Sequence, residues 1–446
     1  MKQLHQTIFV FVMFMVIVGC STKAPGTTAP PSADSNKTEE GEGLTVQTGQ
    51  EGPVTLKLGG IEYQYTEAVI DAFEKKNPNI KIEFTAGNTS FEDGSIQALL
   101  RSGSGPDVLN VSSGPGRVGL LSDSGLIRSI DDIMEKYDIE SRYQAWVIDQ
   151  TRTQGKGKVY ELVEGVDVFS VYYNKEMIEQ NGLELPKSWE EFLDICEKLK
   201  NAGIQPITAG FRKGIGGGWM LGNLIESSAG KDRMTEVIYG DGKFDQPEII
   251  LGGEMLKQLV DRGYVDGKAA LALDQSQAQA ELLNEKAAMT ISPQGFIAAA
   301  RREGTDVSKF DSFVLPSREE GRPGRPSAGL AHSWVVNINA PKEKLFAIEK
   351  WLEWLSSEEY LTIAAANGGS LVPVINAASN IKHDPAIEVA NEMLKNGAGY
   401  NPSVYLPAKA KDAWYAAAEG IVAGTLSPTE AMQMVEAALS QEKQAK

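Results

Sequence analysis

The amino-acid sequence predicts an α/β protein, because strand-like and helix-like segments alternate from the start of its folded part. Residues 54–58 and 80–84 alternate apolar with polar side chains, and an apolar run covers residues 106–111. Between the first two, residues 66–76 carry apolar side chains at helical spacing and end next to Pro78. Strands that alternate with short helices imply a parallel sheet covered by helices on both faces.

Further helices are predicted from their first residues. Residues 188–191 (Ser-Trp-Glu-Glu) have the pattern of a capping box, which opens a helix that extends to Lys200. Residues 245–248 (Asp-Gln-Pro-Glu) open another, with a proline in its first turn. Residues 342–356 and 428–441 are amphipathic at helical spacing, so the helices continue to the end of the chain.

Length and composition are those of a globular protein of two to three domains. The chain has 446 residues, of which 42% are hydrophobic and 23% are charged. Its formal net charge is −17. This balance argues against nucleic acid as a partner, because phosphate contacts need clustered Lys and Arg. A small anionic ligand is not excluded, since a local pair of arginines overrides the global charge.

The first twenty residues have the features of an export signal. Lys2 precedes an apolar run over residues 8–18, which is too short to span a bilayer and has the length of a signal-peptide core. The run leads to Gly19-Cys20, a pattern similar to a bacterial lipobox, so residues 1–19 are predicted to be a signal peptide. Residues 20–52 are then a lipidated cysteine, Cys20, and a flexible tether, because Ser, Thr, Pro, Gly and Glu dominate them. We expect an extracytoplasmic protein that is lipid-anchored to the cell membrane.

Groups for metal or nucleophilic chemistry are scarce. Besides a histidine in the signal, only His332 and His383 occur, so a His-Glu-x-x-His zinc site is impossible. Neither a Gly-x-Ser-x-Gly elbow nor a P-loop is present. Residues 114–119 fit a dinucleotide fingerprint but do not follow the first strand, so we interpret them as a turn and helix start. Cys196 lies on the apolar stripe of a predicted helix and is expected to be a buried hydrophobe. We predict no catalytic residue, metal or cofactor.

Several motifs occur in order along the chain at characteristic spacing. They are residues 99–108 (LLRSGSGPDV), 119–127 (GLLSDSGLI), 171–177 (VYYNKEM), 185–192 (LPKSWEEF), 285–290 (EKAAMT) and 351–359 (WLEWLSSEE). Together they resemble the family 1 extracellular solute-binding proteins of bacterial ABC sugar importers, the group that includes maltodextrin-binding protein. The resemblance extends from about residue 54 to residue 441.

This resemblance implies a two-lobed periplasmic-binding-protein fold of type II, with a hinge and an interlobe cleft. The chain would cross between lobes near residues 165–169, 330–334 and 372–377. The first lobe would then combine residues 53–166 with 333–373, and the second 167–331 with 377–441. The ligand would be a carbohydrate, captured in the cleft by hinge rotation and delivered to the transmembrane subunits of an ABC permease. A monomer that does no chemistry on its ligand is expected.

Four candidate contacts follow from the resemblance. Trp414 matches a tryptophan that stacks on sugar rings in that group, although its helical setting also suits a core residue. Asp167 matches a carboxylate that accepts hydrogen bonds from sugar hydroxyls. Phe296 follows a strand after which relatives often carry a tryptophan. Trp219 follows a flexible glycine-rich loop, near which relatives place stacking aromatics, and core packing is its alternative role.

Four further candidates come from their positions on the predicted strands. Tyr63 and Tyr65 follow the first strand, where α/β sheets bind ligands, and one of the two is expected to make contact. Asp107 begins a strand, where turn chemistry is the alternative role. His332 lies at the second crossing, where it contacts either the ligand or the hinge. Sugars need this mixture, since their faces stack on aromatic rings and their hydroxyls bond to carboxylates.

Two other classes of function remain open. The same fold could bind a polyamine, a metal or a phosphate ester in place of a sugar. An extracellular glycoside hydrolase needs only two carboxylates about 5–10 Å apart, and the chain has 60 acidic residues. The motifs quoted above favour binding over hydrolysis.

Overall fold

A single mixed sheet forms the framework of the described chain. The computed structural model describes residues 53–444 except 64, 88–93, 104, 367–373, 375–384 and 395–396. Within them the strands lie side by side in the order β2 (Ile80–Ala86), β1 (Val54–Gly60), β3 (Val108–Ser112), β9 (Ser327–Asn337), β5 (Leu162–Asn174), β7 (Ala287–Pro293) and β6 (Gln205–Thr208). Three short strands attach to this path: β4 (Ile127–Arg128) and β10 (Gly399–Tyr400) to β9, and β8 (Phe310–Phe313) to β5.

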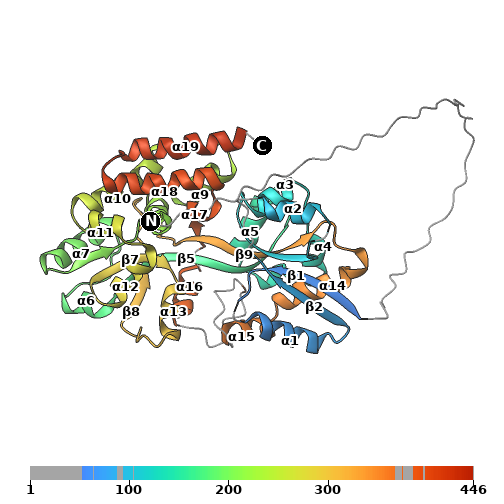
Figure 1. The fold of residues 1–446 in the computed structure, drawn as a ribbon. Helices are drawn as coiled ribbons and strands as arrows, with labels where there is room; N and C mark the ends of the chain where they lie inside the picture. Colours follow the sequence, from blue (N-terminus) through green and yellow to red (C-terminus); the bar gives the residue numbers. More distant parts are fainter. Residues whose placement is uncertain are drawn as a thin grey trace, which may run out of the picture. The chain divides into compact units, whose positions relative to one another are not determined.

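The two long strands β5 and β9 join one group of strands to the other. Strand β9 is antiparallel to β3 through residues 332–336 and to β5 through residues 327–334. Beyond Phe169, β5 is paired with β7 and β8 instead. The predicted crossings near residues 165–169 and 330–334 therefore fall within β5 and β9, which Figure 1 shows running through the middle of the sheet. The third predicted crossing lies outside the described residues, apart from Val374, which forms a bridge to Tyr143.

The expectation of parallel pairing is correct at the two ends of the sheet and wrong at its centre. Strand β1 is parallel to β2 and β3, and β6 is parallel to β7. The central pairs β3–β9, β9–β5 and β5–β7 are antiparallel. The reason is that β5 and β9 pass between the two groups in opposite directions, so they pair with each other antiparallel.

Helices cover both groups of strands (Figure 1). Around β1 to β3 lie α1 (Thr66–Lys76), α2 (Ser95–Arg101), α3 (Val118–Asp123), α4 (Asp131–Lys136), η1 (Glu140–Arg142), α5 (Ala145–Gln154), η2 (Lys342–Lys344), α14 (Leu345–Leu355) and α15 (Glu358–Ala366). Around β6 to β8 lie α6 (Lys175–Gln180), α7 (Trp189–Asn201), α8 (Ile215–Ser228), α9 (Gly230–Tyr239), α10 (Pro247–Asp261), α11 (Gly267–Ala272), α12 (Gln275–Leu283), α13 (Gly295–Arg302), α16 (Pro385–Met393), α17 (Pro402–Tyr405), α18 (Ala408–Ala423) and α19 (Pro428–Gln444).

The predicted helix starts hold, with two differences of detail. The Ser188 hydroxyl caps α7 by accepting a hydrogen bond from the backbone N–H of Glu191 at 3.1 Å. The Glu191 carboxylate accepts from the backbone N–H of Lys187 rather than from that of the N-cap, so the capping box is shifted by one residue. Helix α10 has Pro247 as its first residue and Gln246 as its N-cap, so it begins after the first residue of the predicted opening, Asp245.

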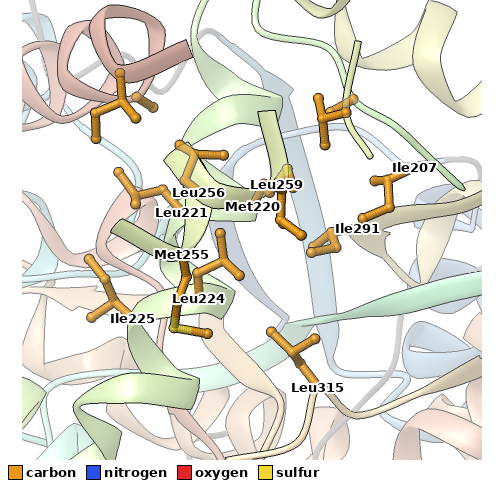
Figure 2. Packing of buried hydrophobic residues seen from close by; sticks show 14 of the residues in the cluster. Ile207, Met220, Leu221, Leu224, Ile225, Met255, Leu256, Leu259, Ile291 and Leu315 are labelled. Atoms are coloured by element: carbon orange, nitrogen blue, oxygen red, sulfur yellow. The ribbon is translucent and has the colours of Figure 1, made fainter. Parts of the chain in front are cut away.

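Separate hydrophobic clusters support the two groups of strands. The larger packs α8 and α10 against β6 and β7, as shown in Figure 2 for Met220, Leu224, Leu256 and Ile291 among others. Cys196 is fully buried in this cluster, which confirms its predicted role as a small hydrophobe. A second cluster gathers Phe73, Trp334 and Trp351 beneath β1 to β3. Two packed units joined by crossing strands confirm the α/β fold class, while the exact lobe boundaries remain a prediction.

The described part of the chain adds two negative findings. No helix in it is both long and apolar enough to cross a membrane. Within the same residues, no group of three or more His, Cys, Asp or Glu side chains is arranged to hold a metal ion. The predicted signal peptide, Cys20 and the tether lie outside the described residues.

Candidate ligand-binding site

Asp167 is the carboxylate that the crossing strand β5 holds at the centre of the sheet. Its neighbours on the strand are fixed by the side chain of Gln294, just after β7. The Gln294 amide oxygen accepts from the Val168 N–H at 2.8 Å, and its amide nitrogen donates to the Val166 carbonyl at 2.9 Å. The amide thus continues the pairing of β5 where β7 ends, and it immobilises the backbone on either side of Asp167.

The Asp167 carboxylate itself has no hydrogen-bond partner among the described residues. It remains partly exposed. Burial raises its pKa to about 6. A largely desolvated carboxylate without a donor has unused acceptor capacity, which suits a ligand that brings hydroxyl or N–H groups.

Tyr63, which follows β1, lies near this carboxylate, and His332 of β9 lies next to Tyr63. The two rings meet edge to face, with centroids 5.7 Å apart. The Tyr63 hydroxyl is buried without a hydrogen-bond partner in the structure. Burial raises the pKa of Tyr63, and the charges of Glu164 and Asp167 raise it further. The sequence analysis predicted that the segment after β1 and the second crossing contribute to one site. The contact between Tyr63 and His332 is consistent with that prediction.

His332 is held in its neutral form. Burial lowers its pKa to about 4, and the charge of Arg117 contributes to the shift. Its Nδ1 is buried and has no partner in the structure. A neutral imidazole has one donor and one acceptor nitrogen, so it matches a ligand hydroxyl in either role.

Tyr65 has a structural role, which favours Tyr63 as the ligand contact of the two tyrosines. It stacks on Tyr63 with ring centroids 5.1 Å apart, and its hydroxyl donates to Glu164 at 3.0 Å. Glu164 is buried and also accepts hydrogen bonds from the Asn110 amide and the Tyr360 hydroxyl. Tyr65 is therefore a buried support for Tyr63.

Trp219 lies on the face of β5 that carries Asp167. Its ring packs against Phe169 at a centroid distance of 5.3 Å, and Phe169 follows Asp167 by two residues on the strand. Trp219 is partly exposed. An aromatic face therefore lies near the carboxylate, as stacking on a sugar ring requires.

The glycines before Trp219 are packed and helical, which corrects the expectation of a flexible loop. Residues 215–228 form α8, so the glycines belong to its first turns. A Cβ atom at Gly217 would lie 2.3 Å from the Phe211 ring, and one at Gly218 would lie 2.6 Å from Cε1 of Tyr415. Glycine is needed here because neighbouring rings lie directly on the helix backbone.

Tyr415 and Arg117 belong to the same region, and the sequence reasoning missed both. Tyr415 lies on the glycine face of α8 and is partly exposed. Burial raises its pKa, whereas a hydrogen bond with Ser403 and the charge of Arg117 lower it. The charge of Arg117 also acts on His332, so its guanidinium lies near both Tyr415 and His332. The signal was its position directly after β3, at the carboxyl end of a parallel strand.

Trp414, the residue before Tyr415, is packed in the core, which favours the alternative role that its helical setting suggested. It is fully buried, its indole N–H donates to the Ser403 hydroxyl at 3.1 Å, and its ring packs near Phe244. Successive residues of a helix point about 100° apart. The rotation of α18 therefore turns Tyr415, and not Trp414, toward α8.

Asp107 is also corrected to a structural role. It is buried and accepts hydrogen bonds from the Lys57 backbone N–H at 2.7 Å and from Lys344 Nζ at 2.9 Å. It lies before the start of β3, whereas Ser112 at the other end of that strand pairs with His332. Its charge is fully used in fastening η2 to the sheet.

Phe296 lies apart from the other candidates. It meets Tyr172 edge to face at 4.9 Å and packs in a small cluster under α13. Tyr172 is five residues from Asp167 on β5, and side chains alternate along a strand, so the two point to opposite faces of the sheet. The structure thus does not bring Phe296 to the Asp167 group.

The glycine pattern at residues 114–119 is a packed turn. Gly114 has φ +116°, and a Cβ there would lie 2.8 Å from the Val404 carbonyl. At Gly116 a Cβ would lie 2.9 Å from Pro407. The backbone of α17 and of the residues that follow it occupies the space that a dinucleotide phosphate would need, which supports the interpretation as a turn.

The candidate site that we call the crossing site consists of Tyr63, Arg117, Asp167, Trp219, His332 and Tyr415. It contains an unpaired carboxylate, a neutral imidazole, a guanidinium and aromatic faces from both groups of strands. Such a site binds a polar ligand with ring faces and hydroxyl edges. Fold and site together define a two-lobed binding protein of the periplasmic type.

Comparison with protein families identifies the class more closely. Residues 59–361 match the family model described as bacterial extracellular solute-binding protein. The match covers more than half of the chain, so the chain belongs to the family of bacterial extracellular solute-binding proteins. This membership confirms the resemblance drawn from the sequence motifs and implies an extracytoplasmic location.

Individual relatives have low sequence identity to this chain, but their alignments cover about two thirds of it or more. The chain is 23% identical over 307 residues to the multiple sugar-binding protein of Streptococcus mutans, covering 65% of this chain and 67% of that protein. It is 24% identical over 340 residues to the sn-glycerol-3-phosphate-binding periplasmic protein of Shigella flexneri, covering 71% and 73%. A solved chitin oligosaccharide binding protein superposes with a TM-score of 0.73 at 20% identity, covering 87% of this chain and 98% of the other. This last likeness shows the shared fold.

Proposed function

We propose that the chain is the substrate-binding lipoprotein of an ABC importer, and that it captures a carbohydrate at the crossing site. One observation carries the proposal: the Asp167 carboxylate is partly exposed and lacks any donor among the described residues. Its charge acts on Tyr63, and the Trp219 ring packs on Phe169, two residues further along β5. The relatives named for multiple sugars and for chitin oligosaccharide support a carbohydrate as the ligand class.

In this proposal the ligand closes the two lobes. Tyr63, His332 and Arg117 contact it from the side of β1 to β3, and Trp219 and Tyr415 contact it from the side of β6 to β8. A ligand that bonds to both sides stabilises only the closed arrangement, because only there are all its partners within reach. The closed form then docks on the transmembrane subunits of the permease, and the bound carbohydrate leaves unchanged. The proposed lipid on Cys20 and the tether to residue 52 would hold the protein at the membrane during this cycle.

A phosphate ester is the second candidate ligand. The relative named for sn-glycerol-3-phosphate favours a phosphate ester. The position of Arg117 in the crossing site also favours it, because one guanidinium group can donate two parallel hydrogen bonds to phosphate oxygens. Asp167 argues for the carbohydrate, because a second negative charge beside a phosphate is unfavourable. A carbohydrate and a phosphate ester would use the same residues in different ways, so a single screen of both ligand classes distinguishes the two proposals.

The test is a thermal-shift screen of the chain from Glu51 onward. Its panel holds neutral and acidic mono- and oligosaccharides together with glycerol 3-phosphate. A ligand at a hundred times its dissociation constant adds about 2.7 kcal/mol to the free energy of unfolding, which raises the melting temperature by several degrees. A shift with a glycan that is recovered intact supports the proposal. A shift with glycerol 3-phosphate alone assigns the site to phosphate esters, and release of smaller sugars from the glycan would indicate a hydrolase.

The lipoprotein part of the proposal has its own test. Expressed with its first fifty residues in a bacterial host, the wild-type protein is expected in the membrane fraction with a mass increased by the lipid. The Cys20→Ser variant should lose both properties. Membrane association that survives this substitution would show that another segment holds the protein.

A further inference from the structure

A cavity of about 400 Å³ lies on the opposite face of β5 from the crossing site. It is enclosed by the end of β5, by α13, by the segment that leads into β8 and by Val389 of α16, elements that Figure 1 shows together in the second group of strands. The volume is within the usual range for small-molecule pockets, roughly 300–1,000 Å³. None of the residues assigned to the crossing site lines it.

The floor of this cavity is apolar and partly aromatic. Tyr172, Ile297, Val307 and Phe310 line it, and each is less than a tenth exposed. The Tyr172 ring is fixed from behind by Phe296 at 4.9 Å. A fixed aromatic and aliphatic floor favours a ligand whose body is a small ring or a branched hydrocarbon.

The rim of the cavity carries positively and negatively charged side chains, which differ in their hydrogen-bond and ion-pair partners. Asp306 accepts from the Ser308 backbone N–H at 3.0 Å, and Asp311 accepts from the Ser312 backbone N–H at 2.8 Å. Lys175 lines the rim and is half-buried, and it forms no ion pair with a carboxylate in the described chain. The neighbouring Lys309 is already paired with Glu285. Lys175 is thus a rim cation without an ion pair in the described chain.

We propose that this cavity is a second binding site, independent of the crossing site, for a small organic anion with a ring or branched apolar body. The body lies on Tyr172, Ile297 and Phe310, and a carboxylate of the ligand pairs with Lys175, with Arg301 on the same rim. Desolvation of Lys175 by the bound ligand strengthens this ion pair relative to one on the open surface. Five residues along β5 separate Tyr172 from Asp167 on opposite faces, so both sites can be occupied at once.

The experiment is calorimetric titration of the chain from Glu51 with phenylacetate, using its neutral amide as a matched probe. The wild-type protein is expected to bind one equivalent of phenylacetate and to bind the amide about tenfold or more weakly, since one charge-assisted hydrogen bond is lost. Lys175→Met should weaken phenylacetate binding by the same factor. Lys158→Met, which removes an exposed lysine elsewhere, should leave it unchanged.

A second variant tests the cavity itself. Thr305 lines the mouth and is exposed, so Thr305→Trp should fill the mouth without disturbing the core and should abolish binding. Saturable binding lost in Lys175→Met and Thr305→Trp but retained in Asp167→Asn supports the proposal. Binding that is absent from the wild type, that falls equally in Lys158→Met, or that requires Asp167 would overturn it.

Discussion

Gln294 holds the backbone of β5 on both sides of Asp167, through an amide oxygen 2.8 Å from the Val168 nitrogen and an amide nitrogen 2.9 Å from the Val166 oxygen. Strand β7 ends at Pro293. The Gln294 side chain makes the hydrogen bonds to β5 that the backbone of a further β7 residue would make. The carboxylate at the centre of the crossing site is therefore positioned by a group on a different part of the chain.

Replacing Gln294 should disturb both stability and ligand binding. Gln294→Ala leaves a buried N–H and a buried carbonyl without partners, at a cost of about 1–3 kcal/mol for each group. We expect a lower free energy of unfolding in urea and weaker ligand binding, because Asp167 loses its fixed position. Gln433→Ala, an exposed glutamine on α19, is the control and should leave both unchanged. Full affinity in Gln294→Ala would show that β5 keeps its geometry unaided.

Asp167→Asn should make the protein more stable while it weakens binding. Because burial raises the folded-state pKa of Asp167 to about 6, the charged form destabilises the fold above the unfolded pKa of about 3.9. The variant is expected to gain about 1–3 kcal/mol at pH 7. The gain should vanish below about pH 4, grow up to about pH 6 and stay level above it. Urea titrations of both proteins between pH 3.5 and 8 measure this, and a gain independent of pH would contradict the assignment.

Substitution of two tryptophans should distinguish a residue that contacts the ligand from one that packs in the core. Trp219→Ala is expected to weaken ligand binding by about 1–3 kcal/mol if the ring stacks on a sugar, with a smaller effect on stability. Trp414→Ala removes a fully buried ring and should lower the free energy of unfolding by about 3–5 kcal/mol. Melting curves and calorimetric titration of both variants measure these effects. If Trp414→Ala instead weakens ligand binding and Trp219→Ala mainly lowers the free energy of unfolding, the ligand contacts Trp414.

Lys344→Ala should destabilise the fold strongly without a direct effect on the ligand. Its ammonium group is the counter-charge of buried Asp107 at 2.9 Å, so its removal leaves a buried carboxylate unpaired. Such losses cost about 3–5 kcal/mol, whereas Asp107→Asn together with Lys344→Met should recover much of the stability. Retained ligand affinity in the folded double variant would confirm that Asp107 lies outside the site. Lost affinity would return Asp107 to the list of contacts.

The sequence predicted the fold and its crossing strands well because these depend on local patterns. Alternating runs and caps set the elements, and the motifs around Tyr173 and Met289 lie on β5 and β7, the strands that flank the site. Tyr63 and His332 could be selected as candidates because strand ends and crossings determine where they lie, whereas Asp167 and Trp219 came from the family resemblance.

The errors have physical causes that the sequence does not display. Trp414 and Tyr415 are adjacent on one helix, and only the packing of α18 on α8 decides which one faces the site. Asp107 is neutralised by Lys344, which is 237 positions away in the chain. The glycines before Trp219 suggested flexibility, but they are required by the rings of Phe211 and Tyr415 that pack on them.

Calorimetric titration of the glycan that gives the largest thermal shift, against wild type and Asp167→Asn, tests the central claim most directly. Asp71→Asn, an exposed carboxylate on α1, is the matched control. We predict one equivalent bound by the wild type and by Asp71→Asn, and binding weakened by about 1.5–3 kcal/mol in Asp167→Asn, as expected for the loss of hydrogen bonds to a charged group. Equal affinity in all three proteins would contradict the account and place the ligand elsewhere.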